Sequence, residues 1–192
     1  MISFNLFKIK VQVSFAFTVF ITLLAVLDNT GLLFISFLAI LFHEIGHILA
    51  IQGLGVKDIK LMLVLGSVRI ETKGYLSDKS SAVVSLFGPL VNLILSAFIF
   101  FKNYYLAYFG AANLIVFIFN MLPINGLDGG DILKHVLKCI FHRKSDSIFK
   151  TISLIFTISF TAICGTFFAI KYFNPTLLIV GIYLIIMSIK KV

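Results

Sequence analysis

Apolar stretches long enough to cross a bilayer recur along this chain. A spanning helix needs about 20 mostly apolar residues to cover the hydrocarbon layer. Short polar segments such as 28–31 ("DNTG") and 102–103 separate the stretches. The pattern predicts six transmembrane helices, at about residues 11–27, 31–52, 80–101, 104–122, 150–170 and 174–189.

Two longer connections interrupt these spans. Residues 53–79 contain alternating, β-branched stretches around Gly66, which predict two short strands. Residues 123–149 open on the Pro/Gly-rich "PINGLDGG" and continue as a short amphipathic helix that lies at the interface or packs into the bundle. The expected fold class is therefore an all-α integral membrane protein of about six transmembrane helices, with a small membrane-associated β element between spans two and three.

Composition and charge agree with this layout. The 192 residues are 60% hydrophobic and 12% charged, whereas soluble domains carry roughly 45–50% apolar and 25% charged residues. Apart from Lys102 and Lys171, the sixteen Lys and Arg residues fall near the termini, in the two longer connections or, for Lys150, at the end of a span that adjoins a connection, and all of these places share one side of a six-span layout. The positive-inside rule then predicts a multi-pass cell-membrane protein with cytoplasmic N- and C-termini. Topology explains the net charge of +8, so nucleic-acid binding is not expected.

The second span carries three polar residues within "LAILFHEIGHILA", residues 38–50. His43 and His47 stand at i and i+4, so they lie on one helical face and can hold one metal ion. Glu44 beside them can take the proton of a metal-bound water. A lone histidine in a helix is usually a structural core residue, but burying ionisable groups in a membrane is costly. The group therefore indicates a metal site rather than a packing role.

A catalytic zinc ion usually has three protein ligands and a water, so the histidine pair lacks one ligand. Asp128 and Asp131 follow the break "NMLPINGLDGGD" at the end of the fourth span. His47 lies about 7–8 Å before the inner end of its span, and Asp128 reaches a similar depth if the break folds back into the bundle. Asp128 is the predicted third ligand and Asp131 the alternative. Asp128 could also cap the 129–140 helix.

Two further histidines, His135 and His142, lie in the basic segment after the break. Their neighbours are lysines and an arginine, so we expect their side chains to face the membrane interface rather than the metal. The two cysteines, Cys139 and Cys164, form no CxxC pair and are read as reduced bystanders.

Three motifs in order resemble one known family. "HEIGH" (43–47) matches an HExxH motif, "FGPLVN" (87–92) matches Gly-Pro-x-x-Asn, and "NMLPINGLDGG" (120–130) matches Asn-x-x-Pro followed by Leu-Asp-Gly. Over about residues 35–135 the chain resembles the site-2 protease family of intramembrane zinc metalloproteases.

The resemblance implies roles for individual residues. His43, His47 and Asp128 would hold one Zn²⁺ ion, and Glu44 would be the general base. Asn120 would orient the substrate or stabilise the oxyanion. The 53–79 connection is similar to the family's membrane-associated β-sheet, which is thought to receive an extended substrate.

Within the family, a compact six-span layout without a PDZ domain looks most like the stage IV sporulation FB branch. That branch releases a membrane-tethered pro-sigma factor, so the implied partners are such a substrate, regulatory membrane proteins and the bilayer. The chain departs from the branch at Gly66-Ser67, where a glycine pair is expected, and carries no CBS domain before Val192. We expect one polytopic protease domain over 1–192, with its catalytic core at about 31–140 and no PDZ or CBS domain.

The expected reaction is zinc-assisted peptide hydrolysis in or near a transmembrane segment. The substrate must unwind locally, and it could then add as a strand to the edge of the 60–72 sheet. One alternative is a divalent-metal transporter that uses His43, Glu44, His47 and Asp128 as a transit site. Transporters tend to contain internal repeats, which this sequence does not show. Another alternative is a catalytically silent membrane scaffold that keeps zinc for structure.

Overall fold

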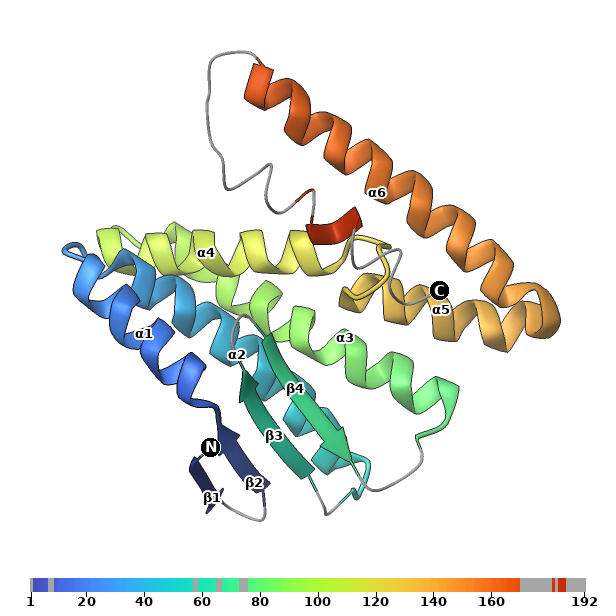
Figure 1. Cartoon of the computed structure of the whole chain (residues 1–192), viewed down its shortest axis with the longest axis horizontal. Coiled ribbons are helices and arrows are strands. Elements are labelled where there is room, and N and C mark those ends of the chain that lie inside the picture. The colour runs from blue at the N-terminus through green and yellow to red at the C-terminus, as the bar shows by residue number, and fades with distance from the viewer. Residues whose placement is uncertain are drawn as a thin grey trace. The chain divides into compact units, whose positions relative to one another are not determined.

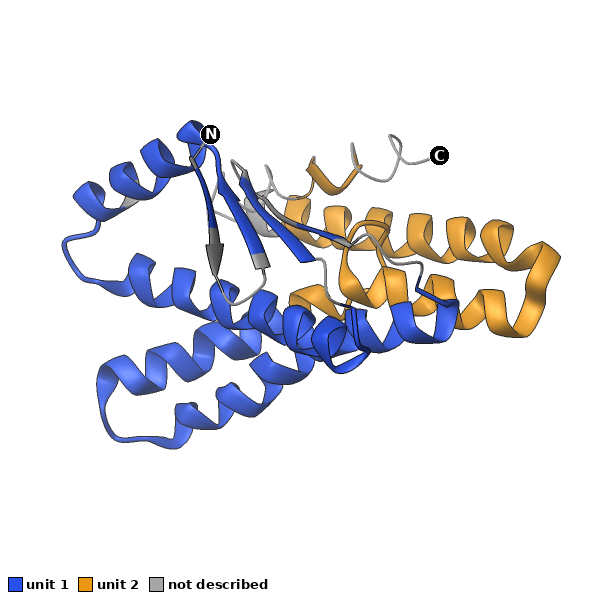
Figure 2. Ribbon diagram, turned by 90° about the horizontal axis from the view of Figure 1, so that it is seen from below, with its two compact units in different colours: residues 1–118 blue, residues 119–192 orange. Residues whose placement is uncertain are grey.

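The computed structural model places most of the 192 residues in helices (Figure 1). It describes residues 2–6, 9–56, 59–64, 67–72, 76–169, 181 and 183–185. These residues divide into two compact units, residues 1–118 and residues 119–192 (Figure 2).

Unit 1 begins with a strand hairpin and contains a four-stranded sheet among its described residues. The strands are β1 (Ile2–Leu6), β2 (Ile9–Val13), β3 (Ile59–Val64) and β4 (Ser67–Thr72), and they lie in sequence order. The β1–β2 and β3–β4 pairs are antiparallel, whereas β2 and β3 are parallel with Val11 opposite Leu61. Two of the four strands, β3 and β4, therefore lie in the connection where the sequence predicted strands.

The other two strands correct the prediction for the N-terminal segment. The first predicted span begins at about residue 11, but β2 occupies residues 9–13 and α1 (Phe15–Leu27) starts only after it. The reason lies in the stretch "IKVQV", where apolar residues alternate with Lys10 and Gln12 in the period of a strand. Pairing with β3 then fixes this stretch as extended backbone.

The remaining helices of unit 1 are apolar. They are α2 (Leu32–Gly53), α3 (Asp78–Leu95), the 3₁₀ helix η1 (Ser96–Phe100) and α4 (Tyr104–Asn120), which ends just beyond the unit. The backbones of α2 and α3 approach closely: a Cβ atom added to Gly46 would lie 2.6 Å from the carbonyl oxygen of Phe87. Near the end of α2, Ile48 and Ile51 are buried together with Ile59 of β3, so the sheet packs against this helix.

Unit 2 contains α5 (Asp128–Phe141), the short 3₁₀ helix η2 (His142–Lys144) and α6 (Ser145–Ala169). The helices α5 and α6 pack against each other, and Phe149 is buried at their contact with Lys134 above its ring. The predicted 129–140 helix is present, but it begins at Asp128, and Leu127 occupies the N-cap position. Asp128 is therefore the first helical residue rather than the cap.

Three stretches of the described chain are long and apolar enough to cross a membrane: 32–53, 78–100, and one within 128–166. The helices α1 and α4 are apolar but shorter, at 13 and 17 residues. The sixth predicted span, 174–189, falls mainly outside the described residues. The count of six spans therefore stays a prediction.

The distribution of polar side chains also indicates a membrane protein. On α2 and α4, large apolar side chains such as Phe34 (62%) and Ile115 (67%) are exposed. Polar side chains on the same helices, such as His43 (5%) and Asn113 (0%), are buried. Exposed apolar area on this scale is unfavourable in water but suits contact with lipid.

Candidate metal centre

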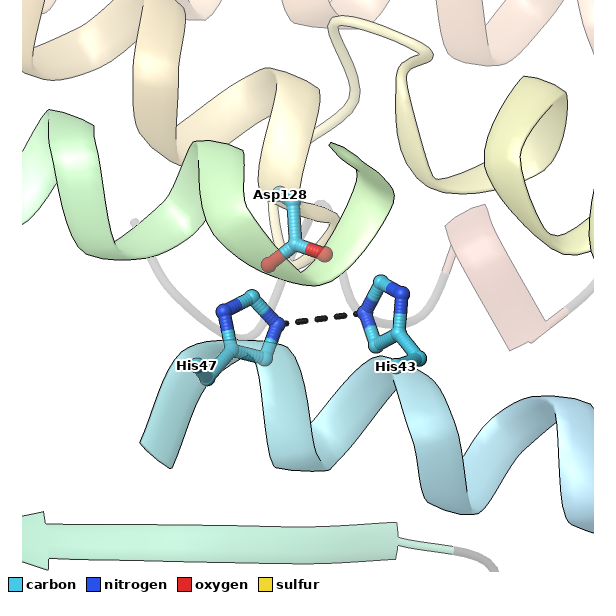
Figure 3. Close-up of side chains that lie close together, drawn as sticks. All are labelled: His43, His47 and Asp128. Atoms are coloured by element: carbon cyan, nitrogen blue, oxygen red, sulfur yellow. Dashed lines mark hydrogen bonds between the residues drawn. The ribbon is translucent and has the colours of Figure 1, made fainter. Parts of the chain in front are cut away.

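The two histidines of the HEIGH motif face each other on α2. His43 and His47 are both buried, and their ring centroids lie 4.7 Å apart with the ring planes nearly perpendicular. The two Nε2 atoms lie 3.1 Å apart, along the dashed line in Figure 3. The helix supplies this proximity because residues four positions apart stand one above the other on one face.

Each histidine is oriented from α3 through its other ring nitrogen. The Nδ1 atom of His47 lies 2.8 Å from the carbonyl oxygen of Val84, and Nδ1 of His43 lies 2.6 Å from Oδ1 of Asn92. Carbonyl oxygens only accept hydrogen bonds, so both Nδ1 atoms carry the proton. Both Nε2 atoms then present lone pairs toward the same point.

Such a pair of nitrogens fits a zinc ion. Two lone pairs 3.1 Å apart repel each other unless a cation, either a proton or a metal ion, lies between them. Two nitrogen ligands of a tetrahedral zinc ion, each at about 2.0–2.1 Å from the metal, are separated by about 3.3–3.4 Å. The observed separation is close to that value. The hydrogen bonds at Nδ1 are also the kind that orient metal-ligating histidines in proteins.

Asp128 completes a possible metal site. One ligand atom each from His43, His47 and Asp128 can be chosen so that all lie within 4.8 Å of one another (Figure 3). Asp131, the alternative ligand, does not belong to this group, and neither do His135 and His142. His142 is exposed at the end of α5. Two histidines and a carboxylate form a ligand set found in catalytic zinc sites.

The local backbone explains why Asp128 lies where it does. After α4 the chain turns tightly: Ile124 N–H donates to the carbonyl of Leu122, and Leu127 N–H donates to that of Ile124. The first turn of α5 then packs on this segment so closely that Gly129 and Gly130 have no room for a Cβ. Asp128 stands at the helix N-terminus, where the helix dipole favours a carboxylate.

The two predicted catalytic residues lie on helices at half-buried positions. Glu44 follows His43 on α2, and Asn120 is the last residue of α4. The catalytic roles that the motifs imply for Glu44 and Asn120 stay predictions.

The sequence did not indicate the residues that orient the histidines. Asn92 lies within the FGPLVN motif, but the motif by itself did not connect it to His43. Asn113 on α4 bonds to Asn92 and lies outside the quoted motifs. Gly88 leaves space for the His47 ring, which a Cβ would overlap. The available signal was an asparagine inside an otherwise apolar span, where an unpaired amide is costly.

The chain is similar to known peptidases. The model of peptidase family M50 matches residues 102–164, which include Asp128. A zinc metalloprotease from Methanocaldococcus jannaschii is 30% identical over 152 residues, which are 70% of this chain and 44% of that protein. The chain thus spans less than half the length of this curated relative.

The fold is also that of a solved structure. The site-2 protease from Methanocaldococcus jannaschii superposes with a TM-score of 0.64 at 20% sequence identity, covering 98% of this chain and 94% of the other. At this identity the likeness shows the fold. The family model and the curated relative support membership of peptidase family M50, and the solved structure shows that the fold is that of a site-2 protease.

Proposed function

We propose that this chain is an intramembrane zinc metalloprotease. It hydrolyses a peptide bond in or near the transmembrane segment of a membrane-tethered protein. The observation that carries the proposal is the pair of Nε2 atoms 3.1 Å apart, grouped with the Asp128 carboxylate in a chain whose large apolar side chains are exposed. A metal site with this ligand set is suited to metal-assisted hydrolysis.

The residues divide the chemistry among them. His43, His47 and Asp128 hold one zinc ion, which when bound polarises the scissile carbonyl and makes a water more acidic. Glu44 accepts the proton from the attacking water and passes it to the leaving amine. Asn120 donates a hydrogen bond from its amide to the substrate carbonyl oxygen, which positions the bond and stabilises developing charge.

The substrate has to reach the site as extended chain. In a transmembrane helix every backbone carbonyl is already hydrogen-bonded, so the segment must unwind before it is cleaved. The sheet of unit 1 offers a place for extended chain. Among the described strands, β3 is paired on both sides and β4 lies at an edge. The strand β1 lies at the other edge, but β4 belongs to the connection that resembles the substrate-receiving sheet of the family, so we place the extended substrate at the outer edge of β4, where it adds by backbone hydrogen bonds.

The finer assignment concerns topology and substrate. The bias of basic residues supports six spans in the cell membrane with cytoplasmic termini, so cleavage occurs toward the cytoplasmic side. The substrate we propose is a tethered pro-sigma factor, with regulatory membrane proteins as further partners. This part rests on the motifs that resemble the stage IV sporulation FB branch. A divalent-metal transporter is not favoured, because the comparisons point to peptidases.

The test uses the purified chain in nanodiscs with a membrane-tethered reporter peptide. Glu44→Gln should keep stoichiometric zinc and lose about 10²–10⁴-fold in cleavage rate, since a positioned base contributes that much. Asp128→Asn should lose both zinc and cleavage. The matched control Asp131→Asn changes a neighbouring carboxylate on the same helix and should retain both.

Three results would contradict the proposal. Cleavage by Glu44→Gln at the wild-type rate would show that Glu44 is not the general base. Loss of zinc in Asp131→Asn but not in Asp128→Asn would show that Asp131, and not Asp128, is the third ligand. Zinc flux across proteoliposomes, in a wild-type protein that cleaves no tethered reporter, would favour the transporter.

A further inference from the structure

A chain of buried amides connects α4 to the first histidine of the metal centre. The side chain of Asn113 donates from Nδ2 to the carbonyl of Phe109, at 2.8 Å. Its Oδ1 accepts from Nδ2 of Asn92, at 2.7 Å. Asn92 also donates to the carbonyl of Ala39, at 3.0 Å, and its Oδ1 lies 2.6 Å from Nδ1 of His43. We call Asn113 and Asn92 the amide relay.

Backbone carbonyls fix the direction of every bond in the relay. The carbonyl of Phe109 can only accept, so Asn113 turns its Nδ2 toward it and its Oδ1 toward Asn92. The carbonyl of Ala39 also only accepts, so Asn92 donates one Nδ2 hydrogen to this carbonyl and the other to Oδ1 of Asn113. Its Oδ1 is then the atom left for His43. Flipping either amide would place oxygen against oxygen.

We propose that Asn113 and Asn92 are positioning residues that fix the tautomer of His43. Facing an oxygen, Nδ1 of His43 must carry the proton, so Nε2 keeps the lone pair that a metal ion needs. The inference rests on the proposed function for the use of that lone pair. The inference deepens the proposed function because it adds residues of α3 and α4 to the support of the metal centre on α2.

The two histidines differ in how their tautomers are set. His47 donates to the backbone carbonyl of Val84, which no side-chain substitution removes. His43 depends on two side chains that are both fully buried, at 0% exposure. An amide suits this role because it donates and accepts without charge. A carboxylate in either place would bury a charge and set oxygen against a backbone carbonyl.

A purely structural role for the two asparagines makes a different prediction. Buried amides also join helices in membranes by satisfying each other. In that case their loss would loosen the packing of α2, α3 and α4 without changing which nitrogen of His43 carries the proton. The protonated nitrogen therefore separates the two roles.

The experiment uses the full chain labelled with ¹⁵N-histidine in nanodiscs, without zinc, at a pH where the histidines are neutral. The wild-type spectrum should show His43 with the proton on Nδ1. Asn92→Leu should raise the Nε2–H tautomer of His43 and weaken zinc binding about 10–100-fold, the usual loss for a residue that supports a ligand. Asn113→Leu should shift both in the same direction by less. His47 should keep Nδ1–H in every variant.

Tyr108→Phe is the matched control. Its hydroxyl lies 3.1 Å from that of Ser36, so it also contributes a polar contact between α2 and α4, but outside the relay. This variant should keep the wild-type tautomer and zinc affinity. If both Leu variants behave like Tyr108→Phe, the inference is wrong. If either Leu variant fails to fold, the wild-type spectrum still decides, because an Nε2–H tautomer of His43 there overturns the proposal.

These measurements need no substrate, so they separate this inference from the proposed function. A chain that shows the expected tautomer and zinc affinities but cleaves no tethered reporter would refute the protease and leave the relay standing. A chain that cleaves the reporter while His43 keeps its tautomer in the Leu variants would do the reverse.

Discussion

The helix α2 and the segment 122–130 each supply ligands to the same candidate metal site, but they place them by different means. On α2, a regular helix gives the spacing of His43 and His47, and hydrogen bonds to α3 set the direction of each ring. In 122–130, backbone bonds close a tight turn, and Asp128 takes its place because Gly129 and Gly130 let the chain approach itself.

The difference shows which changes each region tolerates. A ring on a regular helix can turn about its side-chain bonds, so its direction depends on polar partners. The carboxylate at the turn depends on the path of the backbone, so it is sensitive to added volume. Substitutions that add a methyl group should therefore damage the turn most, and loss of a polar partner should matter most on α2.

The largest effect is expected at the turn. In Gly130→Ala the new Cβ overlaps the backbone carbonyl of buried Ile124, and neither backbone can yield cheaply. The turn must open, so the variant should lose zinc and at least about 100-fold in cleavage, with a destabilisation of about 1–3 kcal/mol. Zinc content, reporter cleavage and thermal unfolding measure these.

The control for the turn is Gly165→Ala on α6. A Cβ at this position would meet nothing within 4 Å, and alanine favours the helix more than glycine does. This variant should match the wild type or unfold at a slightly higher temperature. Equal behaviour of the two alanine variants would contradict the dependence of the turn on its glycines.

An intermediate effect is expected where α2 meets α3. In Gly46→Ala the new Cβ would lie 2.6 Å from the carbonyl oxygen of Phe87, so the backbones of the two helices must move apart. That movement stretches the bond from His47 to Val84 and should weaken zinc binding about 10-fold. Gly53→Ala, at the open end of the same helix, should leave zinc affinity unchanged. Zinc titration against a chelator compares them, and a reversed order would refute the prediction.

The smallest effect is expected from a polar partner of the turn. The hydroxyl of Ser153 on α6 accepts a hydrogen bond from Asn125 N–H, at 2.8 Å. Ser153→Ala should cost about 0.5–1.5 kcal/mol, as one hydrogen bond usually does, and should lower zinc affinity only a few-fold. Thr151→Val removes an exposed hydroxyl of the same helix and serves as the control. If Ser153→Ala lost as much zinc affinity as Gly130→Ala, the turn would depend on its polar partner as strongly as on its glycines. The difference proposed between the turn and α2 would then be wrong.

The sequence predicted the parts of the site that depend on local pattern. The i, i+4 spacing of His43 and His47 needs only the period of a helix, and the proline and glycines of the break showed where the fourth span ends. Asp128 followed from depth along two spans. The structure groups these three residues, and their use as zinc ligands stays a prediction.

Other parts depend on which segments meet in three dimensions. The bonds of His43 to Asn92 and of Asn92 to Asn113 join positions 49 and 21 residues apart. No local period indicates such pairs. The start of α1 was placed too early for a related reason. An apolar run gives the same signal as helix or strand until a partner such as β3 decides.

The parallel pairing of β2 with β3 has a consequence for the path that the chain takes between these strands. The described residues between these strands form the helices α1 and α2, yet β2 and β3 run side by side in the same direction. The chain must therefore go out along one helix and come back along the other before the sheet can join. The pairing therefore constrains how α1 and α2 cross any layer that they traverse. It forms only when the N-terminal hairpin and the hairpin after α2 end on the same side.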